Sequence, residues 1–202
     1  MDKSIKKPPF VMDKEKGKQT LLEVAHIFDT FQLNYFLVQG TALGAYRDKG
    51  FTPTEADIDF GFLQEDFSPA SVTIVSELMY AGFEVRTINR PFTKCRTIVA
   101  DRDGVHLDLV SFVKWRGKRF VSRPMDCRNL PPYSIVHSAR MIESYDQVEL
   151  FGRKFQVPWP VQDYLRLEYG SDWQTPKHDH ISRTRIYNFV NEQGIPHELL
   201  DA

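Results

Sequence analysis

Two aspartates one residue apart, Asp57 and Asp59, are the residues whose type and spacing most clearly indicate chemistry. Successive side chains of a β-strand point to opposite faces, so Asp57 and Asp59 share one face while Ile58 turns to the other. Two carboxylates held this close repel each other unless a cation lies between them. Mg²⁺ takes oxygen ligands and commonly binds one or two carboxylates together with substrate phosphates, and Mn²⁺ suits the same ligands. The pair therefore predicts a divalent metal site and a phosphoryl-type transferase.

A third carboxylate, Asp108, lies in the alternating segment 105–110 and shares a face with His106. A lone charge in an apolar strand is costly to bury, so Asp108 needs a partner. If this strand lies beside the one that carries Asp57 and Asp59, Asp108 becomes a third metal ligand or the base for an acceptor hydroxyl. An ordinary salt bridge or a loop cap is the other interpretation.

Gly40 and Thr41 follow a short apolar run and precede a small, helix-compatible segment. A glycine at a helix start permits close backbone approach, and the N–H groups there attract phosphate. Thr41 adds a hydroxyl, and Arg47 is within reach of the same phosphate. We therefore predict a phosphate-binding turn at Gly40, Thr41 and Arg47; a plain turn with a threonine N-cap is the alternative.

The elements that must position these residues can be predicted from apolar spacing and from turn residues. Helices are expected over residues 20–31, 41–46, 69–81, 161–169 and 181–193. Strands are expected over residues 35–38, 58–62, 83–88, 95–100 and 105–113, with a hairpin over 148–157 about Gly152. This order predicts an α+β fold with a mixed β-sheet flanked by helices and a small C-terminal helical lobe. We expect a single domain over residues 1–202, with the catalytic sheet over about 20–115 and the hairpin and helical part over about 145–202.

The composition of the chain bears on its partners and on its location in the cell. The 202 residues are 42% hydrophobic and carry a formal net charge of −1, as expected for a globular protein without a general attraction to nucleic acid. No apolar run is long enough to span a bilayer, and the basic N-terminus lacks the apolar core of a signal peptide. Cys95 and Cys127 lie in no metal-ligand spacing. These features predict a cytoplasmic location.

Two separate motifs resemble the LicD/fukutin-related family. The first motif of the family joins a Gly-Thr-Leu-Leu-Gly-like turn and an arginine to an Ile-Pro-Trp-Asp-x-Asp-x-Asp-like strand. In this sequence the turn and the arginine read Gly40-Thr41-Ala42-Leu43-Gly44-Ala45-Tyr46-Arg47. The strand reads Phe51-Thr52-Pro53-Thr54-Glu55-Ala56-Asp57-Ile58-Asp59. The second resembles the family's closing segment and includes Val157-Pro158, Tyr164-Leu165, Tyr169-Gly170, Trp173 and Pro176. Thr54 stands where the family usually has tryptophan, and Ala56 where it often has another acid.

The resemblance implies a nucleotidyltransferase-type fold and transfer of a phospho-alcohol. The group would be phosphocholine or an alditol phosphate, moved from a CDP-linked donor to a glycan or related acceptor. By position, Asp57 and Asp59 become the metal-binding pair, Asp108 the third carboxylate, and Gly40 and Thr41 the phosphate-binding turn. Mg²⁺ or Mn²⁺ is the implied cofactor.

Two other functions stay open at this point. One is a nucleotidyltransferase that uses an NTP to modify a small molecule and shares the same metal-binding acids. The other is a non-catalytic nucleotide-binding module of the same fold. Three retained acids argue against the second, because clustered carboxylates without a cation destabilise a fold.

Overall fold

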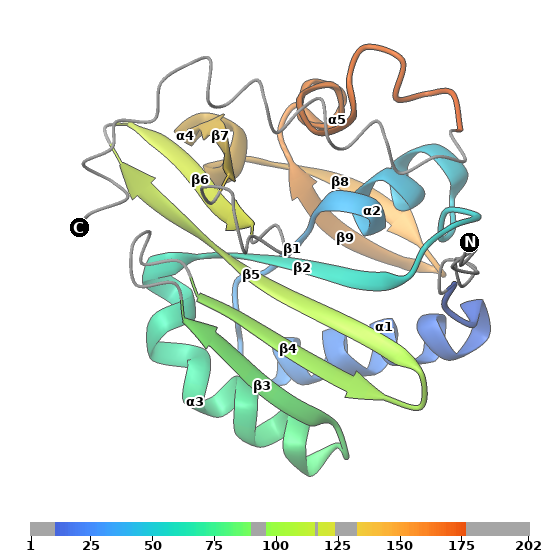
Figure 1. The fold of residues 1–202 in the computed structure, drawn as a ribbon, viewed down its shortest axis with the longest axis vertical. Coiled ribbons are helices and arrows are strands. Elements are labelled where there is room, and N and C mark those ends of the chain that lie inside the picture. The colour runs from blue at the N-terminus through green and yellow to red at the C-terminus, as the bar shows by residue number, and fades with distance from the viewer. Residues whose placement is uncertain (1–10, 90–95, 116, 124–132, 177–202) are drawn as a thin grey trace, which may run out of the picture.

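A mixed β-sheet runs through the computed structural model of the protein, which describes residues 11–89, 96–115, 117–123 and 133–176 (Figure 1). The strands are β1 (Phe36–Leu37), β2 (Asp57–Leu63), β3 (Glu84–Asn89), β4 (Arg96–Arg102), β5 (Val105–Trp115), β6 (Lys118–Arg123), β7 (Tyr133–Ser138), β8 (Tyr145–Leu150) and β9 (Arg153–Pro158). The helices are α1 (Lys14–Thr30), α2 (Gln39–Leu43), the π-helix η1 (Gly44–Asp48), α3 (Gln64–Tyr80), α4 (Ala139–Glu143) and α5 (Val161–Tyr169).

The sheet has the order β1-β2-β5-β4-β3, and β6 and β7 extend it from the far end of β5. The pair β2 and β5 is parallel, whereas β1, β3 and β4 join the sheet antiparallel. Helices α1 and α3 cover one face, and α2, α5 and the β8–β9 hairpin lie on the other (Figure 1). The predicted α+β class with a mixed sheet flanked by helices is confirmed.

Helix α1 shows why the core faces one side of the sheet. Its buried residues recur at helical spacing and include Leu21, Val24 and Phe28. The Phe28 ring packs edge-on against Phe60 and Phe62, with centroids 5.2 and 5.4 Å apart. Because side chains alternate along β2, Phe60 and Phe62 share the core face with Ile58, and Asp57 and Asp59 point to the opposite face.

Several predicted boundaries shift for local reasons. Helix α1 begins six residues before the predicted start, because the Asp13 carboxylate caps it by accepting hydrogen bonds from the N–H groups of Glu15 and Lys16, both at 3.0 Å. Helix α2 begins at Gln39 rather than after Gly40, so the glycine lies inside the first turn.

The two predicted hairpin turns are confirmed. Asp103 and Gly104 join β4 to β5 with φ of 53° and 81°, and Phe151 and Gly152 join β8 to β9 with φ of 53° and 79°. Paired positive φ angles match the right-handed twist of the strands and favour glycine at the second position. Helix α5 has the predicted bounds, and Gly170 follows it with a φ of 92°.

Strands β6 and β7 and the short helix α4 were missing from the prediction. The predicted helix over residues 181–193 lies outside the described residues. Among the helices that the structure does describe, none combines the length and apolarity needed to cross a bilayer.

Candidate functional site

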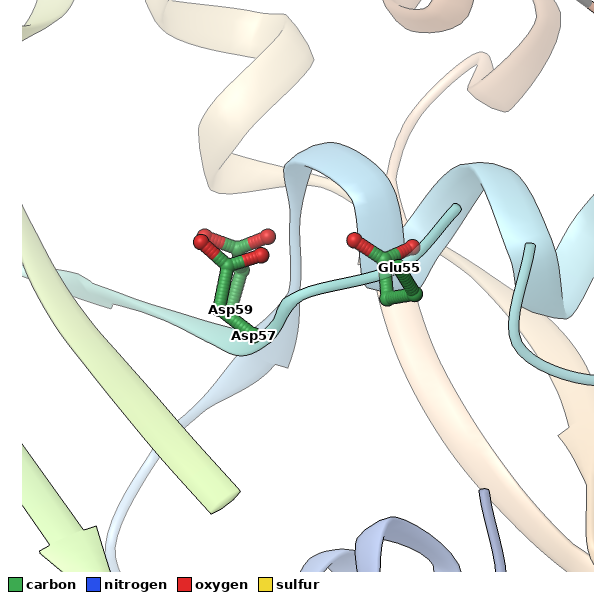
Figure 2. A group of neighbouring side chains, drawn as sticks. All are labelled: Glu55, Asp57 and Asp59. Carbon is green, nitrogen blue, oxygen red and sulfur yellow. The ribbon is translucent and has the colours of Figure 1, made fainter. Parts of the chain in front are cut away.

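Three carboxylates gather where the chain enters β2. Glu55, Asp57 and Asp59 each offer an oxygen, and these oxygens lie within 4.8 Å of one another. Figure 2 shows the Asp57 and Asp59 carboxylates side by side and Glu55 next to the neighbouring helix. Glu55 is 3% exposed and Asp59 2%, while Asp57 is half-buried. We call these three residues the acidic group.

Gly40 makes room for the first of these acids. A Cβ atom at position 40 would lie 2.3 Å from Oε1 of Glu55 and 2.8 Å from Oε2, closer than real Cβ contacts. On its other side, Glu55 accepts a hydrogen bond from the Thr52 hydroxyl at 3.1 Å. The glycine of the predicted phosphate turn therefore has a steric role in seating Glu55.

Thr41 fixes the last of the acids. Its side chain is fully buried, and its hydroxyl accepts a hydrogen bond from the backbone N–H of Asp59 at 2.9 Å. This contact joins the first turn of α2 to β2 at the acidic group. Thr41 thus sets the backbone from which the Asp59 carboxylate projects.

Arg47 lies in η1, one turn further along, and its guanidinium has two partners. Nε and Nη2 donate to the Asp48 carboxylate at 2.8 Å each, and Nη1 donates to the carbonyl of Trp173 at 3.0 Å. Arg47 therefore connects η1 to the segment that follows α5. Phosphate binding by Gly40, Thr41 and Arg47 stays a prediction.

Asp108 lies on β5 directly beside Asp59, because the parallel register pairs these two residues. Paired residues of adjacent strands project from the same face of a sheet, so the two carboxylates face the same side. Asp108 is not a member of the acidic group, and its Oδ1 lies 3.5 Å from Nε2 of His106. Its role as a third ligand or as a base stays a prediction.

His106 bridges two aspartates at the edge of the site. Nδ1 lies 2.6 Å from Oδ1 of Asp101, and Nε2 faces Asp108. Hydrogen bonding to Asp108 raises the pKa of His106 to about 9, burial opposes this rise, and Asp101 adds to it. A shallow cavity of about 300 Å³ opens next to these residues, and it is lined by Ala56, Asp57, Asp101, Gly104, Val105 and His106.

Glu55 is the member of the site that the sequence analysis missed. Ala56 stands where the family often has another acid, and Glu55 beside it is the residue that joins Asp57 and Asp59. The signal was the spacing itself, since positions 55, 57 and 59 follow the two-residue period of a strand. The predicted metal pair is therefore part of a regular series of three acids.

The acidic group fits a hard divalent cation. All of its donors are carboxylate oxygens, the ligand type that Mg²⁺, Mn²⁺ and Ca²⁺ prefer. Gathering three like charges on one face, two of them buried, is costly without a cation to offset the repulsion. Gly40 and Thr41 hold the group in place through contacts on α2.

The sequence matches a known family over this region. Residues 32–159, more than half of the chain, match the family described as LicD/FKTN/FKRP, nucleotidyltransferase domain. The matched part contains α2, the acidic group and β5. The nucleotidyltransferase description agrees with the mixed sheet and its flanking helices.

Two curated proteins are similar to most of the chain. The uncharacterized protein T07A5.1 of Caenorhabditis elegans is 27% identical over 163 residues, which cover 79% of this chain and 42% of that protein. The ribitol-5-phosphate transferase FKTN of Mus musculus is 22% identical over 170 residues, which cover 81% of this chain and 34% of that protein. The chain therefore spans less than half the length of either relative.

Two solved structures of one antibiotic-resistance factor, ANT(2'')-Ia, are also similar in outline. The solution structure has a TM-score of 0.49 at 14% identity and covers 94% of this chain and 89% of that one. The crystal structure with adenylyl-2''-tobramycin has a TM-score of 0.45 at 17% identity and covers 88% and 90%.

Proposed function

The chain belongs to the LicD/FKTN/FKRP family, and on that premise we propose that it is a metal-dependent transferase of a phospho-alcohol. The donor is a CDP-linked alditol or choline, and the acceptor is a glycan or a related hydroxyl compound. The observation that carries the proposal is the acidic group, whose three carboxylates approach within 4.8 Å inside the matched region.

The residues that would hold the cation are Glu55, Asp57 and Asp59. When bound there, Mg²⁺ or Mn²⁺ would supply the positive charge that offsets the negative charge of a donor diphosphate and of the nucleotide leaving group. Glu55 and Asp59 are buried and held by Thr52 and Thr41, so they would fix the position of the cation. Asp57 is half-buried and borders the shallow cavity, so it would lie on the substrate side.

Asp108 has a separate role in the proposal. It faces the same side as Asp59 from the neighbouring strand but lies outside the acidic group. A carboxylate in that place can accept the proton of an acceptor hydroxyl. His106 contacts Asp101 through Nδ1 and Asp108 through Nε2, and this contact would orient the Asp108 carboxylate for that task.

An alditol phosphate is the favoured group because of the named relative. The mouse protein is called a ribitol-5-phosphate transferase, and it is similar to 81% of this chain. CDP-ribitol is therefore the first donor to test, with CDP-choline second.

A thermal-shift screen of the purified chain tests the donor class. We expect CDP-ribitol or CDP-choline to raise the Tm only when Mg²⁺ or Mn²⁺ is present, because the diphosphate binds through the cation. The Asp57→Asn variant should lose that shift, and Glu65→Gln, a matched change of an exposed acid on α3, should keep it. A shift with NTPs alone would contradict the phospho-alcohol donor, and no shift with any nucleotide would contradict catalysis.

A further inference from the structure

Glu168 and Tyr164 of α5 and His137 of β7 form a buried polar cluster next to the start of α2. Nε2 of His137 lies 3.0 Å from Oε1 of Glu168, and the side chains of both residues are almost wholly buried. The His137 ring stacks on Tyr164 with centroids 5.6 Å apart and planes at 28°, and Phe112 packs edge-on against its other side. Tyr164 is itself fully buried, so its ring is held by stacking on a histidine that Glu168 in turn contacts.

The Tyr164 hydroxyl reaches from this cluster to the start of α2. It accepts a hydrogen bond from the backbone N–H of Gln39 at 2.9 Å, although the two residues are 125 positions apart. Gln39 has a φ of 51°, a left-handed conformation that is strained for a residue other than glycine. Such a conformation persists only where its surroundings fix it, and this hydrogen bond does so.

The two residues after Gln39 are the ones that seat the acids. Gly40 leaves the space that the Glu55 carboxylate occupies, and Thr41 accepts the hydrogen bond from the N–H of Asp59. A shift of Gln39 would move both contacts. The path from the Tyr164 hydroxyl to the acidic group therefore takes only three consecutive residues of α2.

We propose that Tyr164, braced by His137 and Glu168, is a positioning residue that sets the geometry of the acidic group through Gln39, Gly40 and Thr41. The part of this inference that concerns the cation rests on the proposed function. The part that concerns the backbone of α2 does not, and it can be tested in the protein without metal.

The test compares Tyr164→Phe with a matched control, Tyr35→Phe. Both changes remove one hydrogen-bonded hydroxyl and keep the ring. The Tyr35 hydroxyl contacts Asp29 and Arg153, on α1 and β9, and is not bonded to α2. A general effect of losing a tyrosine hydroxyl would therefore appear in both variants, whereas an effect on α2 should appear in Tyr164→Phe alone.

The first measurement is hydrogen exchange of the metal-free protein by mass spectrometry. We expect Tyr164→Phe to speed exchange in the peptides that cover residues 39–43 and 55–59, because the N–H groups of Gln39 and Asp59 depend on the path described above. Tyr35→Phe should leave these peptides unchanged. Equal exchange in wild type and Tyr164→Phe would overturn the inference.

The second measurement is Mn²⁺ affinity, followed by the electron paramagnetic resonance signal of free Mn²⁺. Changes in residues that orient metal ligands typically lower affinity by about 10-fold to 100-fold, so we expect a loss of at least about 10-fold in Tyr164→Phe and none in Tyr35→Phe. Wild-type affinity in Tyr164→Phe would overturn the positioning role. If the wild-type chain binds no Mn²⁺, the proposed function fails, and the exchange data still decide whether Tyr164 orders α2.

Discussion

Two clusters of carboxylates in this molecule are built in opposite ways. In the acidic group, Glu55, just before β2, and Asp57 and Asp59 on β2 bring three like charges together. In the second cluster, Arg119 of β6 lies between Glu65 of α3 and Glu143 of α4. Arg119 Nη1 donates to Glu65 at 2.9 Å, and Nε donates to Glu143 at 3.0 Å.

The difference separates a structural ion-pair contact from the site where we propose that a cation binds. Arg119 is 1% exposed and pairs with both carboxylates, and Lys114 of β5 adds a second positive charge 3.3 Å from Glu143, so this ion-pair cluster ties α3, β5, β6 and α4 together. Its hydrogen bonds lower the pKa of Glu65, as expected for an acid that the protein itself stabilises as a carboxylate. The acidic group places three carboxylate oxygens within 4.8 Å of one another, an arrangement that a hard divalent cation can bind.

The largest expected effect comes from removing one charge of the acidic group. Asp57→Asn and Asp59→Asn should each abolish turnover, because the cation loses a ligand. The fold should be retained or slightly stabilised, since each change relieves like-charge repulsion. Turnover with CDP-linked donors and thermal unfolding of the purified variants check both parts, and normal activity in either variant would disprove the metal assignment.

A core substitution should give the opposite result, a large loss of stability with the cation site intact. Phe28→Ala should lower the free energy of unfolding by roughly 3–5 kcal/mol, because the ring is fully buried against Phe60 and Phe62. Urea denaturation measures this change. A loss below about 1 kcal/mol would show that the helix face does not pack as described.

Breaking the ion-pair cluster should lower the free energy of unfolding by less than Phe28→Ala does. Arg119→Met should lower the free energy of unfolding by about 2–3 kcal/mol, below the roughly 3–5 kcal/mol of fully buried pairs, because Glu65 and Glu143 reach solvent. Mn²⁺ affinity should not change. A variant that unfolds like wild type but loses Mn²⁺ would reverse the roles assigned to the two clusters.

The smallest effect is a change in acid sensitivity. The Arg119 hydrogen bond lowers the folded-state pKa of Glu65, so its contribution to stability is present above the ordinary pKa and is lost as pH falls through the lowered one. Glu65→Gln should therefore make the fall of Tm below about pH 4.5 shallower than in wild type. An identical pH profile would show that the pair contributes no measurable stability.

Local signals in the sequence were sufficient to predict the strand that carries Asp57 and Asp59. The alternation of Asp57, Ile58 and Asp59 predicted which side chains share a face, and the parallel neighbour β5 brings Asp108 beside Asp59 as that prediction required. Glu55 was overlooked because it precedes the strand proper, where the alternation is harder to recognise.

Contacts between distant residues could not be predicted in the same way. Arg119 looks like a surface residue in the sequence, and its partners Glu65 and Glu143, 54 and 24 positions away, explain its burial. The Tyr164 hydroxyl and the N–H of Gln39 are likewise unrelated in sequence, and the need for glycine at position 40 follows from Glu55. These relations depend on tertiary packing, which apolar spacing does not encode.

Calorimetric titration of Mn²⁺ into wild type, Asp59→Asn and Glu65→Gln tests the central claim most directly. The two substitutions each neutralise one carboxylate, the first in the acidic group and the second in the ion-pair cluster. We expect wild type and Glu65→Gln to bind Mn²⁺ with equal affinity and Asp59→Asn to lose binding. Unchanged binding in Asp59→Asn, or equal loss in both variants, would contradict the assignment of the cation site to Glu55, Asp57 and Asp59.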